Sequence, residues 1–295
     1  MFYRPNILVA TDLSETSDLA LEAAGELCRR SSGNISVVHV SQIPEQWDWL
    51  SGEVDMTFYP DNYREQLLKA VRDRLEDQIN RCLVNAEIEI AFGHPVKGIL
   101  ETADKRHADI IILGHRGKGT HFHLGDVAAK VVAASSRPVL VINREFSLDR
   151  VAGLIDPFLQ EKRIFSVTAE LAGVGASKQE YISLWPDVPV FVERDVFNSN
   201  IKVDRLTDER KKNIRTELEQ RIRDNIDRSV STTIRAEVSP EHKLRDGIVR
   251  VLEEDQVDVA VMSKHQKGKL EKILLGSSTR GVLDHWKGNL LVLPS

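Results

Sequence analysis

A glycine-rich loop with two cationic residues is the part of the sequence best suited to chemistry. The run Gly114-His115-Arg116-Gly117-Lys118-Gly119 directly follows a short apolar stretch. Glycine lets backbone N–H groups approach an anion, and the side chains of Arg116 and Lys118 add positive charge, so the loop could hold a phosphate group. A glycine-rich connection between a strand and a helix is also a common tight turn. The loop by itself leaves both interpretations open.

Histidines gather in the same loop. His115, His121 and His123 lie close to Asp126 along the chain. Neutral imidazoles with a carboxylate form a ligand set that suits Zn, Ni or Cu. The same histidines could be solvent-facing polar residues or donors to a phosphate, and we expect no metal. The sequence offers no Ser-His-Asp order, Cys-His pair or positioned general base, so it names no catalytic residue.

The elements that must position this loop alternate between strand and helix patterns. Segments that predict strands lie at 7–10, 35–40, 88–90, 109–113 and 139–142. Apolar residues at helical spacing lie between them, which predicts an α/β fold: a doubly wound, Rossmann-like parallel sheet with helices on both faces. Ligands of such sheets bind at the carboxyl ends of the strands, so the loops that follow Ala10, Val40 and Leu113 form the candidate site.

The chain repeats itself. Gly98-Ile99-Leu100 recurs as Gly247-Ile248-Val249, and 109–113 recurs as 258–262, at a constant offset of 149. The chain has 295 residues, about twice the usual length of one domain. We therefore predict two domains of one fold, residues 1–146 and 147–295. In the second domain we expect its first two strands at 163–167 and 188–192, with the helix between them, within 172–186, shortened or absent.

Composition excludes several classes of protein. The net charge is -5, from 40 basic and 45 acidic side chains, which argues against a nucleic-acid partner. No apolar run approaches the roughly 18 residues of a membrane span, and no signal-peptide core is present, so we expect a cytoplasmic protein without a membrane partner. Cys28 and Cys82 lie in predicted helices without metal-type spacing, which fits a reducing compartment.

Several of these segments together resemble a known family. Residues 6–15 (Asn-Ile-Leu-Val-Ala-Thr-Asp-Leu-Ser-Glu), His39-Val40, Leu113-Gly114-x-x-Gly117 and 138–142 look like a universal stress protein domain. The resemblance covers about 4–143 and 205–295, so the whole chain is similar to a tandem universal stress protein. It implies two domains packed as an internal pseudo-dimer, with the strand at 139–142 meeting 290–293 in antiparallel fashion, and a homodimer of the whole chain is a further expectation.

The resemblance also implies a ligand. Nucleotide-binding members of the family use an Asp after the first strand, backbone groups near the end of the second, and a G-x2-G-x9-G-(S/T) loop around the phosphates. The residues that it assigns to an adenine nucleotide (ATP, ADP or AMP) are Ala10, Asp12, Val40, Leu113, Gly114, Arg116, Gly117, Lys118, Gly125, Asp126 and Val127. Asp12 has an alternative role, because an Asp at this place can also cap the helix that follows.

Both halves depart from the family pattern. Only seven residues separate Gly117 from Gly125, and Asp126 replaces the hydroxyl residue, so we expect a nucleotide with fewer phosphates to be tolerated better than ATP. In the second half Ser263 and Gln266 replace the leading glycines, and Thr168 or Glu170 stands where the Asp is expected. A side chain at a close-approach glycine blocks the backbone from an anion, so we expect the second site to be defunct.

The function that follows is a stress-response or regulatory protein. It would bind an adenine nucleotide weakly in its first domain and signal through contacts with an unidentified protein partner. Two alternatives stay open at this point. One is a nucleotide-independent scaffold, and the other is a slow phosphohydrolase or metal-dependent hydrolase that uses the histidine loop.

Overall fold

The chain folds into two compact units. The computed structural model describes residues 2–41, 63–115, 126–156, 162–186, 190–194, 201–204, 208–225, 231–239, 243–264 and 277–294. Unit 1 comprises Met1–Ser147, Ser263–Gly276 and Lys287–Ser295, and unit 2 comprises Leu148–Met262 and Ser277–Trp286. Unit 1 therefore includes segments from near the C-terminal end of the sequence.

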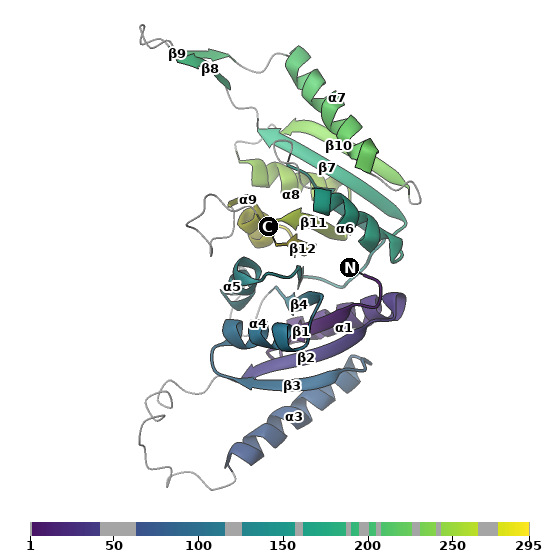
Figure 1. Ribbon diagram of the computed structural model, residues 1–295, viewed down its shortest axis with the longest axis vertical. Helices are drawn as coiled ribbons and strands as arrows, with labels where there is room; N and C mark the ends of the chain where they lie inside the picture. The colour runs from purple at the N-terminus through teal and green to yellow at the C-terminus, as the bar shows by residue number, and fades with distance from the viewer. Residues whose placement is uncertain are drawn as a thin grey trace. The chain divides into compact units, whose positions relative to one another are not determined.

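Unit 1 is a parallel sheet with one antiparallel strand. Its strands are β1 (Asn6–Ala10), β2 (Asn34–Ser41), β3 (Glu87–Phe92), β4 (Ile110–Gly114), β5 (Val139–Ile142) and β12 (Asn289–Leu293). Its helices are α1 (Glu15–Ser31), α3 (Tyr63–Arg81), α4 (Pro95–Lys105) and α5 (Asp126–Ala134). The strand order within the unit is β12-β5-β4-β1-β2-β3, so β1 lies between β4 and β2 (Figure 1). The predicted α/β fold is confirmed.

The central strands of unit 1 are apolar on both faces because helices cover both. Ile110, Ile111 and Ile112 of β4 are fully buried, as are Leu8 and Val9 of β1. Such runs are typical of parallel strands in a doubly covered sheet. The sheet is therefore rigid at the place where β1, β2 and β4 end.

β12 pairs with β5 as predicted. Leu290 lies opposite Val141, Leu291 opposite Leu140 and Val292 opposite Val139, in antiparallel orientation. Asn289 is fully buried at the end of this ladder, and its Oδ1 accepts hydrogen bonds from the backbone N–H groups of Asn143 at 3.0 Å and Arg144 at 3.3 Å. The last strand of the sequence is thus part of the core of unit 1.

Unit 2 has a related order of elements. Its strands are β6 (Arg150–Leu154), β7 (Lys178–Pro186), β8 (Val190–Arg194), β9 (Ile201–Asp204), β10 (Thr232–Ser239) and β11 (Val259–Ser263). Its helices are α6 (Lys162–Gly173), α7 (Asp208–Asn225), α8 (Leu244–Glu254) and α9 (Ser277–His285). The main sheet of the unit has the order β10-β7-β6-β11 and is parallel throughout, whereas β8 and β9 form a separate antiparallel pair.

The prediction for the start of the second domain was wrong. The segment 163–167 belongs to the helix α6, and the first strand is β6. Ile164, Val167 and Leu171 are buried along α6, at a spacing of three and four residues. That period is helical, and it outweighs the strand propensity of the apolar run Ile164-Phe165. The first helix of the domain is present and is shorter than its counterpart, with 12 residues against 17 in α1, but it lies earlier in the chain than expected.

The second strand of unit 2 was also misplaced. The segment 172–186, expected to hold the shortened helix, holds the nine-residue strand β7, which pairs with β6 and β10. The segment 188–192 overlaps β8, whose partner is β9 rather than the main sheet. β8 and β9 therefore lie in the connection between the second strand, β7, and the helix α7.

No helix among the described residues has both the length and the apolar character that a membrane span requires.

Candidate functional site

The predicted site residues of the first half meet at one edge of the sheet. Ala10 lies opposite Val38 of β2 on one side and Leu113 of β4 on the other. Val40 lies two residues further along β2, and Gly114 ends β4. Because these strands are parallel, their carboxyl ends lie side by side, which is where doubly wound sheets bind ligands.

Gly114 has a packing role that does not depend on any ligand. A Cβ atom at this residue would lie 2.8 Å from the backbone oxygen of Thr16, near the start of α1. A side chain here would push α1 away from β4. The glycine is therefore needed for the approach of helix to strand, and its presence alone does not indicate an anion site.

The turn after β1 holds Asp12 in a defined position. Leu13 has a φ of +62°, in the left-handed region that L-residues rarely adopt. Its backbone N–H donates a hydrogen bond of 3.0 Å to the Thr11 hydroxyl. The Asp12 Oδ1 atom accepts hydrogen bonds from the backbone N–H of Ser14, at 3.1 Å, and from the Ser14 hydroxyl. The chain is thus fixed just where β1 leads into α1.

Asp12 supports the start of α1 without being its N-cap residue. Ser14 is the N-cap residue of α1, and the carboxylate of Asp12 braces it. An ionised carboxylate has about four lone-pair directions, so capping does not prevent a ligand from donating to the same group. The role of Asp12 toward a ligand stays a prediction.

Polar residues beyond the predicted ligand-binding set lie around this turn. The backbone N–H of Thr11 donates to the carbonyl oxygen of Val38 at 3.0 Å, and the Nδ1 atom of His39 lies 2.9 Å from the Thr11 carbonyl oxygen. Gln78 of α3 is 1 % exposed and contacts the Thr11 side chain. The sequence does carry a signal for Gln78, because a polar residue interrupts the buried stripe of Leu75 and Ile79.

The rest of the predicted loop is described only at its ends. Arg116, Gly117, Lys118, Gly125, His121 and His123 lie outside the described residues. His115 is 3 % exposed, and its backbone N–H donates to the Ile142 carbonyl oxygen at 2.7 Å, so it is not a solvent-facing residue. Asp126 and Val127 begin α5, and the Val127 side chain is exposed. In the part of the chain that the structure describes, no group of three or more His, Cys, Asp or Glu residues is placed to hold a metal ion.

Unit 2 has an acidic residue at the place of Asp12, but not the residue expected. The backbone N–H of Ile155 donates to Ile182 of β7 just as that of Thr11 donates to Val38 of β2, so Ile155 and Asp156 correspond to Thr11 and Asp12. Thr168 lies inside α6 and is fully buried, and Glu170 lies on the same helix. Neither is the counterpart of Asp12, because the first strand lies earlier in the chain than predicted.

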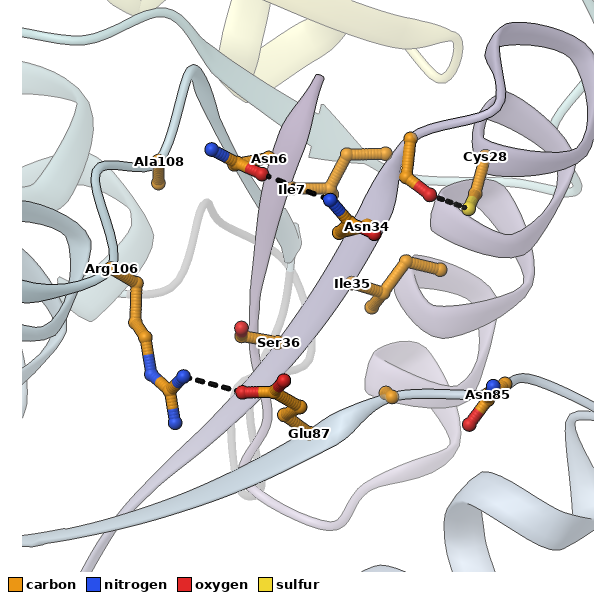
Figure 2. Close-up of a pocket in the computed structure, with 12 residues that line it drawn as sticks. Asn6, Ile7, Cys28, Asn34, Ile35, Ser36, Asn85, Glu87, Arg106 and Ala108 are labelled. Atoms are coloured by element: carbon orange, nitrogen blue, oxygen red, sulfur yellow. Dashed lines mark hydrogen bonds and ion pairs between the residues drawn. The ribbon is translucent and has the colours of Figure 1, made fainter. Parts of the chain in front are cut away.

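A second concave region lies at the opposite, amino edge of the strands of unit 1. The cavity has a volume of about 490 Å³ (Figure 2). Short polar side chains line it together with buried aliphatic ones: Asn6, Asn34, Ser36, Asn85, Ile7 and Ile35. Arg106 also lines it and is paired with Glu87, and the Sγ atom of Cys28 donates to the carbonyl oxygen of Gly33 at 2.9 Å. This cavity is separate from the predicted nucleotide site.

The two cysteines differ in burial, and we expect them to differ in reactivity. Cys28 lies in α1 and is half-buried, whereas Cys82 is buried and lies in the turn one residue beyond α3 rather than in the helix itself. Burial raises the pKa of the Cys82 thiol to about 11. Because the thiolate is the nucleophile, we expect one fast equivalent with Ellman's reagent at pH 8 in the native protein and two after unfolding. Cys28→Ser should abolish the fast phase and Cys82→Ser should keep it, and a fast phase of two equivalents would contradict the assignment.

The fold and the strand ends can now be compared with known proteins. The sequence model of the universal stress protein family matches residues 4–143 and 188–294. Universal stress protein YxiE of Bacillus subtilis is 29 % identical over 145 residues, which cover 46 % of this chain and 97 % of that protein. Universal stress protein MJ0577 of Methanocaldococcus jannaschii is 26 % identical over 157 residues, which cover 48 % of this chain and 96 % of that protein. These relatives each correspond to about half of the chain.

A solved structure matches the whole chain. The crystal structure of a universal stress protein from Archaeoglobus fulgidus aligns with a TM-score of 0.67 and covers 99 % of this chain and 97 % of that one, at 18 % sequence identity. At this identity the match shows the fold alone. The second family match begins at residue 188, whereas the strands of unit 2 begin earlier, with β6 at Arg150.

Proposed function

The chain belongs to the universal stress protein family as a tandem of two such domains, and from this premise we propose that it binds an adenine nucleotide in unit 1 and signals through a protein partner. The observation that carries the proposal is the turn formed by Thr11, Asp12 and Leu13, in which Leu13 has a left-handed backbone conformation, at the place where β1, β2 and β4 end together. The Asp12 carboxylate would accept hydrogen bonds from a ribose or from an adenine amino group.

The two units differ at the corresponding positions, which supports a single site. The second half of the sequence has Ser263 where the first half has Gly114, and Ile155 replaces the hydroxyl residue Thr11. The Ser263 residue is 7 % exposed. Asp156 stands at the place of Asp12, which makes it a matched control for Asp12.

Asp12→Ala tests the proposal. A hydrogen bond between a ligand and a charged group is worth about 1.5–3 kcal/mol, so the substitution should weaken AMP binding by at least about tenfold. Isothermal titration of AMP and ATP into the wild type, Asp12→Ala and Asp156→Ala at one salt concentration gives the measurement. Asp156→Ala is expected to bind as the wild type does. The absence of binding to the wild type would favour the nucleotide-independent scaffold, and equal effects of the two substitutions would place the site elsewhere.

The proposal also includes a preference between AMP and ATP. Asp126 begins α5, directly after the loop that would surround the phosphates. A carboxylate there repels added phosphate charge, so AMP should bind at least as tightly as ATP in the same titration.

A further inference from the structure

A chain of buried polar side chains connects α3 to the turn that carries Asp12. Thr11, Ser17 and Gln78 are 6 %, 3 % and 1 % exposed. The Thr11 hydroxyl donates to the Gln78 Oε1 atom at 2.9 Å, and the Gln78 Nε2 atom donates to the Ser17 hydroxyl at 3.1 Å and to the Asp18 carboxylate. Asp18 in turn forms an ion pair of 2.8 Å with Arg81. Each of these polar side chains has a hydrogen-bond partner within the network, and such full pairing makes a buried polar network rigid.

The network ends on the strained part of the turn. The Thr11 oxygen that donates its proton to Gln78 accepts the backbone N–H of Leu13, the residue with a φ of +62°. Ser17 acts on the other side of the turn, because its hydroxyl accepts the backbone N–H of Ser14 at 3.0 Å and donates to the Ser14 carbonyl oxygen at 2.7 Å. An unusual backbone conformation persists only where its surroundings hold it.

Unit 2 shows that the fold itself does not require this network. There Ile155 stands in place of Thr11, so the corresponding turn has no hydroxyl at that position. Along α7 the buried residues Leu218 and Ile222 match Leu75 and Ile79 of α3, which places Arg221 at the position of Gln78. The Arg221 guanidinium donates to the backbone oxygen of Asp156 at 3.2 Å instead. The Thr11–Gln78 pair is therefore particular to the unit with the proposed site.

We propose that Gln78 is a positioning residue for the nucleotide site: through the Thr11 hydroxyl it holds the 11–14 turn so that Asp12 faces the ligand. The inference rests on the proposed function for its ligand but not for its geometry. Gln78 touches no ligand. It acts from the far side of the turn, and through Asp18 and Arg81 it ties the orientation of Asp12 to the packing of α3 against α1.

The test removes both partners of the central hydrogen bond at once. Thr11→Val with Gln78→Met replaces the pair by apolar groups of similar shape, so neither side chain keeps an unpaired polar group. The Leu13 N–H and the Ser17 hydroxyl each lose their contact with the Thr11 hydroxyl, so stability should fall modestly. We expect the affinity for AMP to fall at least tenfold and the backbone amides of Leu13 and Ser14 to exchange with deuterium at least tenfold faster. Thr102→Val is the matched control, because Thr102 is a buried residue of α4 whose hydroxyl donates to Gly98, away from the turn.

Two milder variants keep the test decisive if the double variant folds poorly. Thr11→Ser retains the hydroxyl and should retain the affinity for AMP. Gln78→Asn retains the amide but is too short to reach Thr11, and it should lose affinity and protection at the turn. Unchanged exchange at Leu13 and Ser14, or a loss of stability without faster exchange there, would overturn the inference. Faster exchange at the turn in a protein whose wild type binds neither AMP nor ATP would instead refute the proposed function and leave the positioning of the turn in place.

Discussion

A chain that ends at residue 286, and so lacks β12, is expected to lose most of its folding free energy and to be recovered as oligomers. Leu290, Leu291, Val292 and Leu293 are each at most 2 % exposed. Burial of such a side chain is worth about 1.5–3 kcal/mol, so these residues together contribute on the order of 6–12 kcal/mol. A domain has only about 5–15 kcal/mol of net stability, so the loss is comparable to the total.

Oligomers are expected because the truncation exposes β5. Val139 to Ile142 are all buried, and without β12 their edge offers unpaired backbone groups beside an apolar surface, which is a template for pairing with another chain. Light scattering after gel filtration and urea unfolding give the measurements. Val141→Lys in the truncated chain should reduce the oligomers, because an edge charge opposes strand pairing. A truncated chain that stays monomeric with an unchanged urea midpoint would contradict the role of β12.

Lys264→Ala is expected to lower the free energy of unfolding by about 2–4 kcal/mol. The Lys264 ammonium is buried, and it donates to the carbonyl oxygens of Ala133 at 2.9 Å and Ser135 at 2.7 Å, at the C-terminal end of α5. Each buried carbonyl left without a donor costs about 1–3 kcal/mol, and the cation also interacts favourably with the negative end of the helix dipole. Lys264→Met keeps the packing of the side chain and should lose less. Lys105→Ala, at an exposed lysine, should stay within about 0.5 kcal/mol of the wild type in the same urea titrations.

The effect of Lys264 also depends on pH. Burial lowers the pKa of the Lys264 amine in the folded protein. The unfolded chain therefore binds more protons than the folded one between the lowered pKa and the ordinary value of 10.5, and the stability contributed at this site rises with pH across that window. The difference in unfolding free energy between the wild type and Lys264→Met should thus move in favour of the wild type as the pH is raised. A constant difference would show that the folded pKa of Lys264 is not lowered.

One ion-pair contact between a strand and a helix occurs in both units, with the positive and negative side chains exchanged. In unit 1 Glu89 of β3 pairs with Lys105 and with Arg106 at the end of α4. In unit 2 Arg235 of β10 pairs with Glu254 and Asp255 at the end of α8. The paired helix residues of the two units are 149 positions apart in the sequence. The strand residues also correspond, because Glu89 follows Ile88 and Arg235 follows Ile234. These two isoleucines lie opposite Val37 of β2 and Tyr181 of β7, which occupy the same place in the two sheets. The strand residue is acidic in unit 1 and basic in unit 2, and the helix residues carry the opposite charge in each case. Each unit therefore has an ion pair at this contact.

The alternation of strands and helices could be predicted from the sequence because it depends on local patterns of apolar residues. A strand that is buried on both faces is a short apolar run, and a helix that is buried along one stripe has apolar residues every three or four positions. The same local pattern gave the repeat and the strands that became β4, β5 and β12. It failed at β6 and α6, where Arg150 and Gly153 weaken the strand pattern and an apolar run with β-branched residues lies within a helix. In this segment strand propensity and helical periodicity disagreed. The segment forms the helix α6, which packs against β6 and β7, as its periodicity indicates.

The sequence by itself determined the fold class, the tandem repeat and the residues of the strand ends, since each of these depends on local periodicity or on a short motif. Only the tertiary structure decided that Asp156 is the counterpart of Asp12, that Lys264 completes unit 1, and that Gln78 braces Thr11. The physical reason is that the contacts of Gln78 and Lys264 join residues more than sixty positions apart, and that the place of Asp156 follows from the register of β6 with β7. Their existence depends on strand register and helix packing, which no local pattern of residues specifies.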